Sequence, residues 1–317
     1  MDGSAPEWFE RVVAVAPEAG RTVVEGAEVA WLAWGDVADP TMVLVHGGAA
    51  HARWWTAIAP FLALHHRVVA IDLSGHGRSD HRERYRPELW AEEVLAVARA
   101  AGSGDPPVVV GHSMGGFVTI VTAAKHGAEL SGAMVLDAPI RRPDPESSEG
   151  RGGRMFRTPK TYPDLATAME HFHLVPPQPC DNPWLVRYIA EHSLHEVPDG
   201  WTWRFDRHLF TRREGPASPS AYADALASAS CRIAIVNGER SDIVDDEVRS
   251  YMAELLADSP AAVAGVPFVE VPEARHHLLL DQPLAVVTAV RAVLASWHPV
   301  GRGPADVVPG ERRVSGG

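Results

Sequence analysis

The sequence feature that most constrains the fold is Val108–Gly116, where three valines run into Gly-His-Ser-Met-Gly-Gly. Three β-branched residues in succession predict a buried parallel strand, and the residues from Met114 onward predict a helix. A serine between such a strand and helix, with glycines at 111 and 115 that let the two elements approach closely, is typical of a nucleophile elbow. We therefore interpret Ser113 as a hydroxyl held at a strand end, above the positively polarised start of a helix.

Strand and helix patterns alternate on both sides of this stretch, which predicts an α/β fold with a doubly wound, mostly parallel sheet. The alternating pattern of residues 21–35 predicts an antiparallel hairpin at one edge of the sheet. Continuous apolar runs predict the remaining strands at 42–45, 67–72, 133–137, 233–236 and 268–271. A last helix is expected to start at Pro283.

The alternation is interrupted between residues 140 and 229, where Pro, Arg and Gly crowd the chain and short helical patterns follow near 163–173, 183–195 and 219–228. We predict an inserted, mostly helical cap at 140–229 and a core formed by 1–139 and 230–298. Residues 299–317 are rich in Gly, Pro and Arg without periodicity, which predicts a disordered tail.

Size and charge restrict the function classes. A chain of 317 residues with 46% hydrophobic content can bury a core large enough for one α/β domain with an insertion. The formal net charge of -12 repels phosphate backbones and anionic lipids, so we expect neither nucleic acid nor a membrane as a partner. No run approaches eighteen consecutive apolar residues, and no basic segment followed by an apolar run opens the chain.

Two cysteines, Cys180 and Cys231, are too few for a disulfide framework and suit a reducing compartment. With the absence of a secretion pattern, they predict a cytoplasmic protein. Although the chain has 16 histidines, their spacing matches no metal-binding pattern, so we expect no metal.

A serine hydroxyl is a weak nucleophile at neutral pH, so catalysis by Ser113 needs a histidine base oriented by an acid. His276 and His277 follow the last predicted strand. That position is the carboxyl end of a parallel strand, where open α/β sheets bind their ligands.

Four motifs together resemble the α/β-hydrolase superfamily, in its serine-nucleophile, cap-bearing branch of esterases and lactonases. They are His46-Gly47-Gly48, Asp72-x-x-Gly75-His76-Gly77-x-Ser79, Gly111-His112-Ser113-Met114-Gly115-Gly116 and His276-x-x-x-x-Asp281-Gln282-Pro283. The resemblance covers about residues 21 to 298.

The resemblance implies Ser113 as nucleophile, His276 as base, and an oxyanion hole formed by the backbone N–H groups of Gly48 and Met114. His276 matches the family histidine better than His277, because it stands seven residues before Pro283. The chain departs from the family at Arg275, where a glycine is usual.

The acid has two candidates. Many family members carry it three residues after the glycine that ends the strand before the last, but Ser241 occupies that position here and Asp242 comes one residue late. Asp137 lies at the end of the strand that follows the elbow helix, a location that some lipases and lactonases of the superfamily use instead. We favour Asp137, with Asp242 as the alternative.

These residues predict a serine hydrolase that cleaves an ester, a lactone or a related acyl bond through an acyl-enzyme, with no cofactor. The cap tryptophans Trp184, Trp201 and Trp203 predict an apolar pocket wall and hence an apolar or aromatic acyl substrate. A carbon–carbon bond hydrolase of aromatic breakdown is one alternative, and a non-catalytic ligand-binding protein on the same fold is another. The oligomeric state stays open.

Overall fold

The computed structural model describes residues 4–143, 159–214 and 220–297. One eight-stranded sheet organises them, in the order β1-β2-β4-β3-β5-β6-β9-β10. The strands are β1 Glu18–Val24, β2 Ala27–Trp34, β3 Thr41–Val45, β4 Arg67–Ile71, β5 Val108–His112, β6 Gly132–Leu136, β9 Ile233–Gly238 and β10 Phe268–Val271. The predicted edge hairpin is β1 and β2, which pair antiparallel. β2 also pairs antiparallel with β4, and the six strands β4, β3, β5, β6, β9 and β10 pair parallel.

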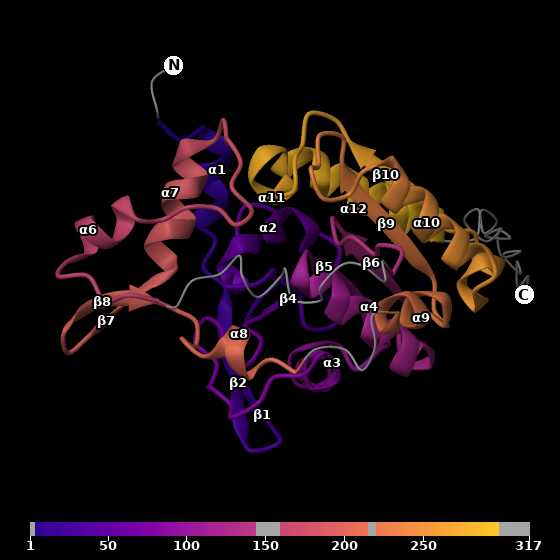
Figure 1. The fold of residues 1–317 in the computed structure, drawn as a ribbon, viewed down its shortest axis with the longest axis horizontal. Coiled ribbons are helices and arrows are strands. Elements are labelled where there is room, and N and C mark those ends of the chain that lie inside the picture. Colours follow the sequence, from indigo (N-terminus) through magenta and orange to yellow (C-terminus); the bar gives the residue numbers. More distant parts are fainter. Residues whose placement is uncertain (1–3, 144–158, 215–219, 298–317) are drawn as a thin grey trace, which may run out of the picture.

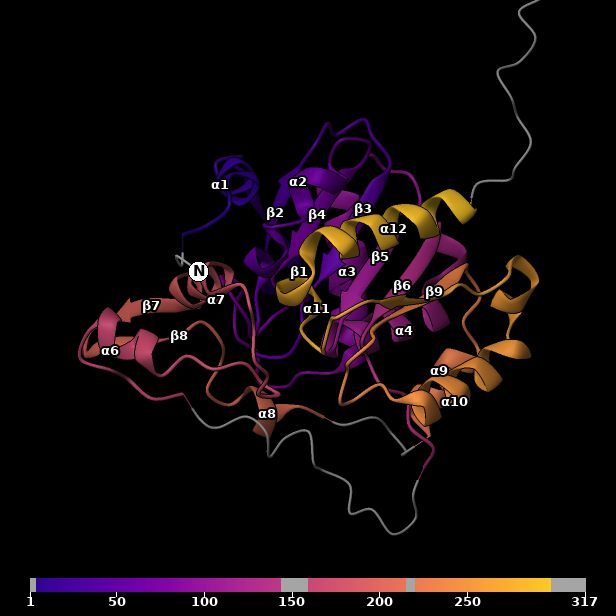
Figure 2. The same cartoon turned by 90° about the horizontal axis from the view of Figure 1, so that it is seen from above.

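Helices cover both faces of the sheet (Figures 1 and 2). One face packs against α3 (Pro87–Ala101), α4 (Met114–His126), α9 (Ala221–Ala227) and α10 (Asp246–Ala257). The other face packs against α2 (Ala59–Leu62), α11 (Leu278–Asp281) and α12 (Pro283–Trp297). The buried apolar side chains accordingly form two clusters, one on each side of the sheet. This arrangement confirms the predicted doubly wound fold.

The winding direction reverses between β3 and β5, because the chain runs outward from β3 to β4 and then returns to place β5 on the other side of β3. Ligands of open α/β sheets bind at such a reversal, outside the carboxyl ends of the strands. Ser113 follows β5 directly. The topology therefore places this serine where a ligand site is expected.

The segment between β6 and β9 includes α6 (Leu165–Glu170), α7 (Pro183–His192) and α8 (Leu209–Arg212), and α6 and α7 stand to one side of the sheet in both views (Figures 1 and 2). It also contains a hairpin of β7 (Leu194–Val197) and β8 (Gly200–Trp203) that the helical periodicity did not predict. The two-residue turn Pro198-Asp199 connects its strands, and Gly200, the first residue of β8, adopts a φ of 128° that favours glycine. The last helix of the segment, α9, packs against α4 and the core.

The N-terminal helix α1 (Glu7–Val13) lies beside α7 (Figure 1), with Trp8 and Trp184 5.6 Å apart between ring centroids. No helix in the described part of the chain combines the length and apolar character needed to cross a membrane. The predicted tail at 299–317 lies outside the described residues.

Candidate active site

Ser113 lies in the sharp turn between β5 and α4, with a φ of 55° and a ψ of -119°. A non-glycine residue at positive φ is strained and persists only where its surroundings hold it. The flanking glycines explain how the turn closes: a Cβ at Gly111 would lie 2.1 Å from the Gly115 carbonyl oxygen, and one at Gly115 would lie 2.3 Å from the Val45 oxygen. Only glycine allows this close packing of strand and helix.

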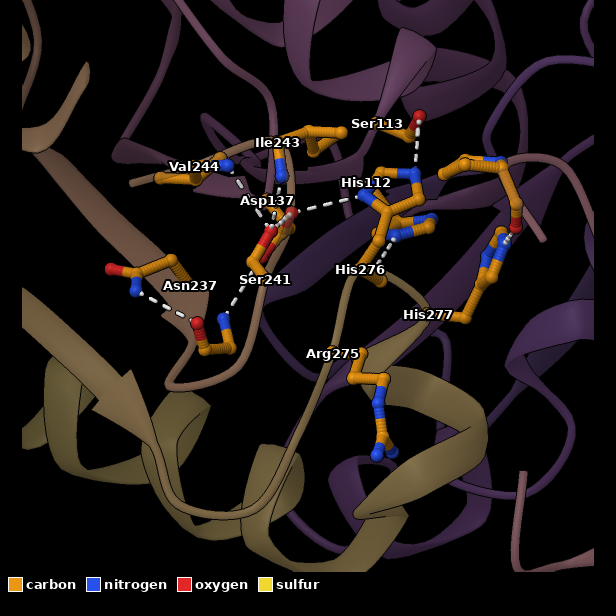
Figure 3. A network of polar contacts seen from close by, with 12 residues as sticks. His112, Ser113, Asp137, Asn237, Ser241, Ile243, Val244, Arg275, His276 and His277 are labelled. Atoms are coloured by element: carbon orange, nitrogen blue, oxygen red, sulfur yellow. Dashed lines mark hydrogen bonds and ion pairs between the residues drawn. The ribbon is translucent and has the colours of Figure 1, made fainter. Parts of the chain in front are cut away.

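His276 connects Ser113 to Asp137 (Figure 3). Its Nε2 lies 3.0 Å from Ser113 Oγ, and its Nδ1 lies 2.9 Å from Asp137 Oδ1. In the neutral tautomer that donates from Nδ1 to the carboxylate, Nε2 is free to accept the serine proton. His276 and Asp137 are 3% and 1% exposed, so water competes little for these hydrogen bonds.

The Asp137 carboxylate is held by donors besides His276. It follows β6 with a φ of 46° and accepts hydrogen bonds from the Gly238 backbone N–H at 2.9 Å and from the Ser241 hydroxyl at 2.7 Å. Asp242, the alternative acid, has an exposed side chain. The structure thus brings Asp137 to His276 and places Asp242 at the surface.

Ser241 is a site residue that the sequence analysis did not predict. There it was named only as the residue that occupies the usual position of the acid. Its hydroxyl donates to Asp137 and accepts from the backbone N–H groups of Ile243 at 3.3 Å and Val244 at 3.1 Å (Figure 3). A hydroxyl that both donates and accepts hydrogen bonds has a fixed orientation. The position three residues after Gly238 was the available signal, because the family motif points to that position.

His112 also supports the site, from inside the elbow motif. Its Nε2 lies 2.8 Å from the His276 carbonyl oxygen, so its N–H anchors the backbone of the histidine loop to the end of β5. Burial first, and then the neighbouring imidazoles His276 and His277, hold the pKa of His112 well below its usual range. His112 is therefore neutral at physiological pH, as one ring N–H and one acceptor nitrogen.

Ser113 opens into a cavity of about 410 Å³, which we call the Ser113 cavity. This volume falls within the range of small-molecule sites. Gly48 lies in its wall, and Met114, the second predicted oxyanion donor, is the first residue of α4. Apolar and aromatic side chains form much of the wall: Trp54, Phe172, Leu174, Val175, Trp203 and Phe205.

Of the three tryptophans predicted to form the pocket wall, the structure places only Trp203 there. Trp184 instead contacts Phe9 of the N-terminal helix, with ring centroids 4.5 Å apart. Trp201 pairs through its backbone with Tyr162, at 2.8 Å in both directions. The two other tryptophans therefore support the segment that carries Trp203.

His112, His276 and His277 form the one imidazole cluster in the described part of the chain whose spacing could hold a metal ion, with ligand atoms within 4.8 Å of one another. Nδ1 of His112 and Nδ1 of His277 are buried without a hydrogen-bond partner among the described residues. Both ring nitrogens of His276 are engaged by Asp137 and Ser113. A metal ion ligated by His276 would therefore disrupt this hydrogen-bond chain.

The sequence pattern of the alpha/beta hydrolase family matches residues 42–290, and the chain belongs to this family. It is similar to the esterase Rv0045c of Mycobacterium tuberculosis, with 28% identity over 88% of this chain and 89% of the relative. A monoacylglycerol lipase of Mycolicibacterium smegmatis is 34% identical over 37% of this chain and 44% of its own length. The thioesterase domain from the curacin biosynthetic pathway shares the fold, with a TM-score of 0.69 and 22% identity over 87% of this chain and 99% of that domain.

Proposed function

We propose that this protein is a serine hydrolase that cleaves carboxylic esters or lactones through an acyl-enzyme. The hydrogen-bond chain from Ser113 through His276 to Asp137, with the serine open to a cavity, is the observation that carries the proposal. The similarity to an esterase and to a monoacylglycerol lipase supports ester chemistry.

In the first half-reaction, Ser113 Oγ attacks the carbonyl carbon while His276 Nε2 takes its proton. Asp137 accepts the Nδ1–H, which keeps the imidazole in the reactive tautomer and stabilises the imidazolium. The Gly48 and Met114 N–H groups stabilise the developing oxyanion. His276 then gives its proton to the leaving alcohol, and in the second half-reaction it activates the water that releases the acid.

The shape of the Ser113 cavity supports an apolar or aromatic acyl group of modest size. Trp54, Phe172 and Trp203 offer aromatic walls, while Lys160 and Glu170 supply polar groups to the same cavity. The apolar walls bind the acyl chain by excluding water, and the polar groups orient the rest of the ester.

The test begins with labelling of the purified protein by a fluorophosphonate probe, followed by peptide mapping to Ser113. Turnover is then measured on matched panels of p-nitrophenyl esters and lactones of increasing acyl length. Labelling of Ser113 with turnover of medium-length esters supports the proposal. A protein that binds these esters but neither reacts with the probe nor turns them over is a ligand-binding protein, and the proposal fails.

A further inference from the structure

A second cavity of about 410 Å³ is lined by four arginine side chains, each from a separate segment. Arg21 comes from β1, Arg53 from the 3₁₀ turn Ala52–Trp55, Arg78 from the loop after β4, and Arg204 from the residue that follows β8. We call it the arginine cavity. Ser113 is not among its lining residues.

Few acidic side chains line this cavity, and most of them are already paired with other groups. Glu191 lines it but pairs with Arg187 at 3.0 Å, and Arg21 pairs with Glu28 at 3.0 Å. Arg53, Arg78 and Arg204 make no ion pair within 4.0 Å with the residues that the structure describes. Asp72 is the one remaining acidic residue of the lining, so three guanidinium groups share one carboxylate.

The Asp72 carboxylate is itself engaged by backbone donors. Oδ1 accepts from the Ala52 N–H at 2.6 Å, and Oδ2 accepts from the Arg78 N–H at 2.9 Å. Asp72 is buried and braces the two loops that carry Arg53 and Arg78. It therefore sets the positions of these arginines without pairing with either guanidinium.

The guanidinium donors are largely uncommitted. Arg204 Nε donates to the Leu194 carbonyl oxygen at 2.9 Å, which leaves its two Nη groups for a ligand. Arg53 Nη1 makes only a long contact of 3.4 Å with the Tyr188 hydroxyl. For the Arg78 guanidinium, the described residues provide no hydrogen-bond acceptor. A protein with a net charge of -12 has here a concentration of free cationic donors.

The surrounding groups respond to this positive field. Burial, followed by the charge of Arg78, lowers the pKa of Arg204; the Asp72 carboxylate opposes this shift and Arg53 adds to it. Burial lowers the pKa of His192 in the same wall, and the charges of Arg53 and Arg78 add to this effect. A bound anion would offset the repulsion between Arg204 and the neighbouring arginines, and the repulsion of the protonated His192 by Arg53 and Arg78.

We propose that the arginine cavity binds a phosphate group, held by Arg53, Arg78 and Arg204. Three guanidinium forks match the several oxygens of a tetrahedral dianion, whereas a single carboxylate offers only two oxygens. Arg53 and Arg204 are half-buried in the cavity lining, and Arg78 is exposed. The phosphate belongs to a free small molecule, because the His51–Ser193 contact and residues 203–205 lie between this cavity and Ser113; a phosphate at the distal end of a Ser113 substrate is the other source that the experiment distinguishes.

A thin wall separates the two cavities. His51 lines the arginine cavity and Ser193 lines the Ser113 cavity, with His51 Nε2 2.9 Å from Ser193 Oγ. Consecutive residues on the other side alternate, since Trp203 and Phe205 line the Ser113 cavity while Arg204 lines the arginine cavity. A ligand held by Arg204 thus lies directly behind the aromatic wall of the reaction site.

Calorimetric titration with inorganic phosphate and pyrophosphate tests the site without reference to catalysis. We expect saturable binding to the wild type, weakened at least about tenfold by Arg78→Gln, Arg53→Gln or Arg204→Gln. Arg207→Gln is the matched control, because it removes the same charge from an exposed position three residues from Arg204 and outside the cavity lining. Thermal unfolding of each variant verifies that it is folded.

Absence of saturable binding to the wild type at millimolar anion would overturn the proposal. Equal weakening by Arg207→Gln would also overturn it, because overall charge would then account for the binding. Retention of wild-type affinity in all three cavity variants would do the same.

A second arm distinguishes the two sources of the phosphate and rests on the proposed function. Hydrolysis is compared for a neutral p-nitrophenyl ester and for the same ester with a phosphate at the far end of its acyl chain. If the phosphate belongs to the substrate, Arg204→Gln raises KM for the phosphorylated ester about tenfold or more relative to the neutral one. If the phosphate belongs to a free ligand, Arg204→Gln keeps the wild-type ratio of KM values for the two esters but loses the calorimetric binding of inorganic phosphate. Both results support the site, and the calorimetric arm decides it even if neither ester is hydrolysed.

Discussion

The Ser113 cavity and the arginine cavity each enclose about 410 Å³ and share the wall formed by residues 203–205, His51 and Ser193. The Ser113 cavity pairs aromatic walls with a buried hydrogen-bonded chain in which a single carboxylate, Asp137, serves a single base. The arginine cavity instead gathers three guanidinium groups around one carboxylate that backbone N–H groups already satisfy. These two environments meet at residues 203–205, where Trp203 and Phe205 line the Ser113 cavity and Arg204 between them lines the arginine cavity.

The two cavities also differ in how their charged groups are compensated before a ligand binds. Reaction at Ser113 requires charge that appears only during catalysis, so the resting site is satisfied by hydrogen bonds. Binding in the arginine cavity requires charge that is unsatisfied until the ligand arrives. Changes in one cavity should therefore leave the other intact, and the following experiments test that independence.

The largest effect is expected for Ser113→Ala, which removes the nucleophile. Members of such a chain act as a unit, so we expect kcat for ester hydrolysis to fall on the order of 10⁴ to 10⁶. Phosphate binding measured by calorimetry should stay at the wild-type level. Near-normal turnover in this variant would reject the assigned nucleophile.

The next effect separates the two acids. Asp137→Asn should lower kcat by about three orders of magnitude with KM little changed, because the amide cannot hold the histidine in the reactive tautomer. Asp242→Asn is the matched control at an exposed position and should retain most of the activity. Both variants are first compared by thermal melting, since loss of a buried charge partner can destabilise the fold. The reverse ranking would move the acid to Asp242.

The free energy of unfolding should depend on pH through His277, which lines the Ser113 cavity. Burial, with the charge of His276 as a second cause, lowers the pKa of His277 from 6.5 to about 3, whereas the unfolded chain titrates near the ordinary value. Between these values the unfolded state binds the extra proton, so stability present above pH 6.5 is lost as the pH falls. We expect the contribution of His277 to the free energy of unfolding to drop by about 2 kcal/mol between pH 7 and 5.

Urea unfolding of the wild type and of His277→Gln at these two pH values measures this contribution. The variant should lose about 2 kcal/mol less than the wild type over the interval, whatever its absolute stability. Identical losses would mean that His277 is not kept neutral by its surroundings.

Ser241→Ala should have a smaller effect, because it removes one of three donors to Asp137. Loss of one hydrogen bond to a charged group predicts a decrease in kcat of about tenfold, with KM unchanged. Ser241→Thr restores the hydroxyl and should recover most of the rate. A parallel rise in KM, or no recovery in the threonine variant, would assign Ser241 a general structural role instead.

The smallest effect is expected at the shared wall. Trp203→Ala enlarges the Ser113 cavity and should change the ratio of kcat/KM between bulky and small acyl esters by about fivefold. Trp184→Ala, whose ring contacts α1 instead, should leave that ratio unchanged and lower stability by about 2 kcal/mol. An equal change of this kcat/KM ratio in Trp203→Ala and in Trp184→Ala would show that the two tryptophans influence specificity through the fold of the segment as a whole.

Periodicity predicted the core well, because parallel strands buried on both faces are continuous apolar runs, as in Met42–Val45 and Val108–Val110. The segment between β6 and β9 was harder to predict. The hairpin β7–β8 has residues of intermediate exposure at six of its positions, including Gly200, so it lacks the alternation of buried and exposed residues that marks a strand. Its turn, Pro198-Asp199 followed by Gly200, was the more informative feature.

The sequence by itself determined the strands, the strained serine turn and the spacing that singles out His276, because each depends on residues close together in the chain. Only the tertiary structure decided which carboxylate meets His276, since Asp137 and Asp242 both follow central strands and differ in burial and direction. It alone also decided that Arg53, Arg78 and Arg204 surround one cavity. Such a charge cluster leaves no periodic trace in the chain, because its members come from distant segments that only the folded sheet and the segment beside it bring together.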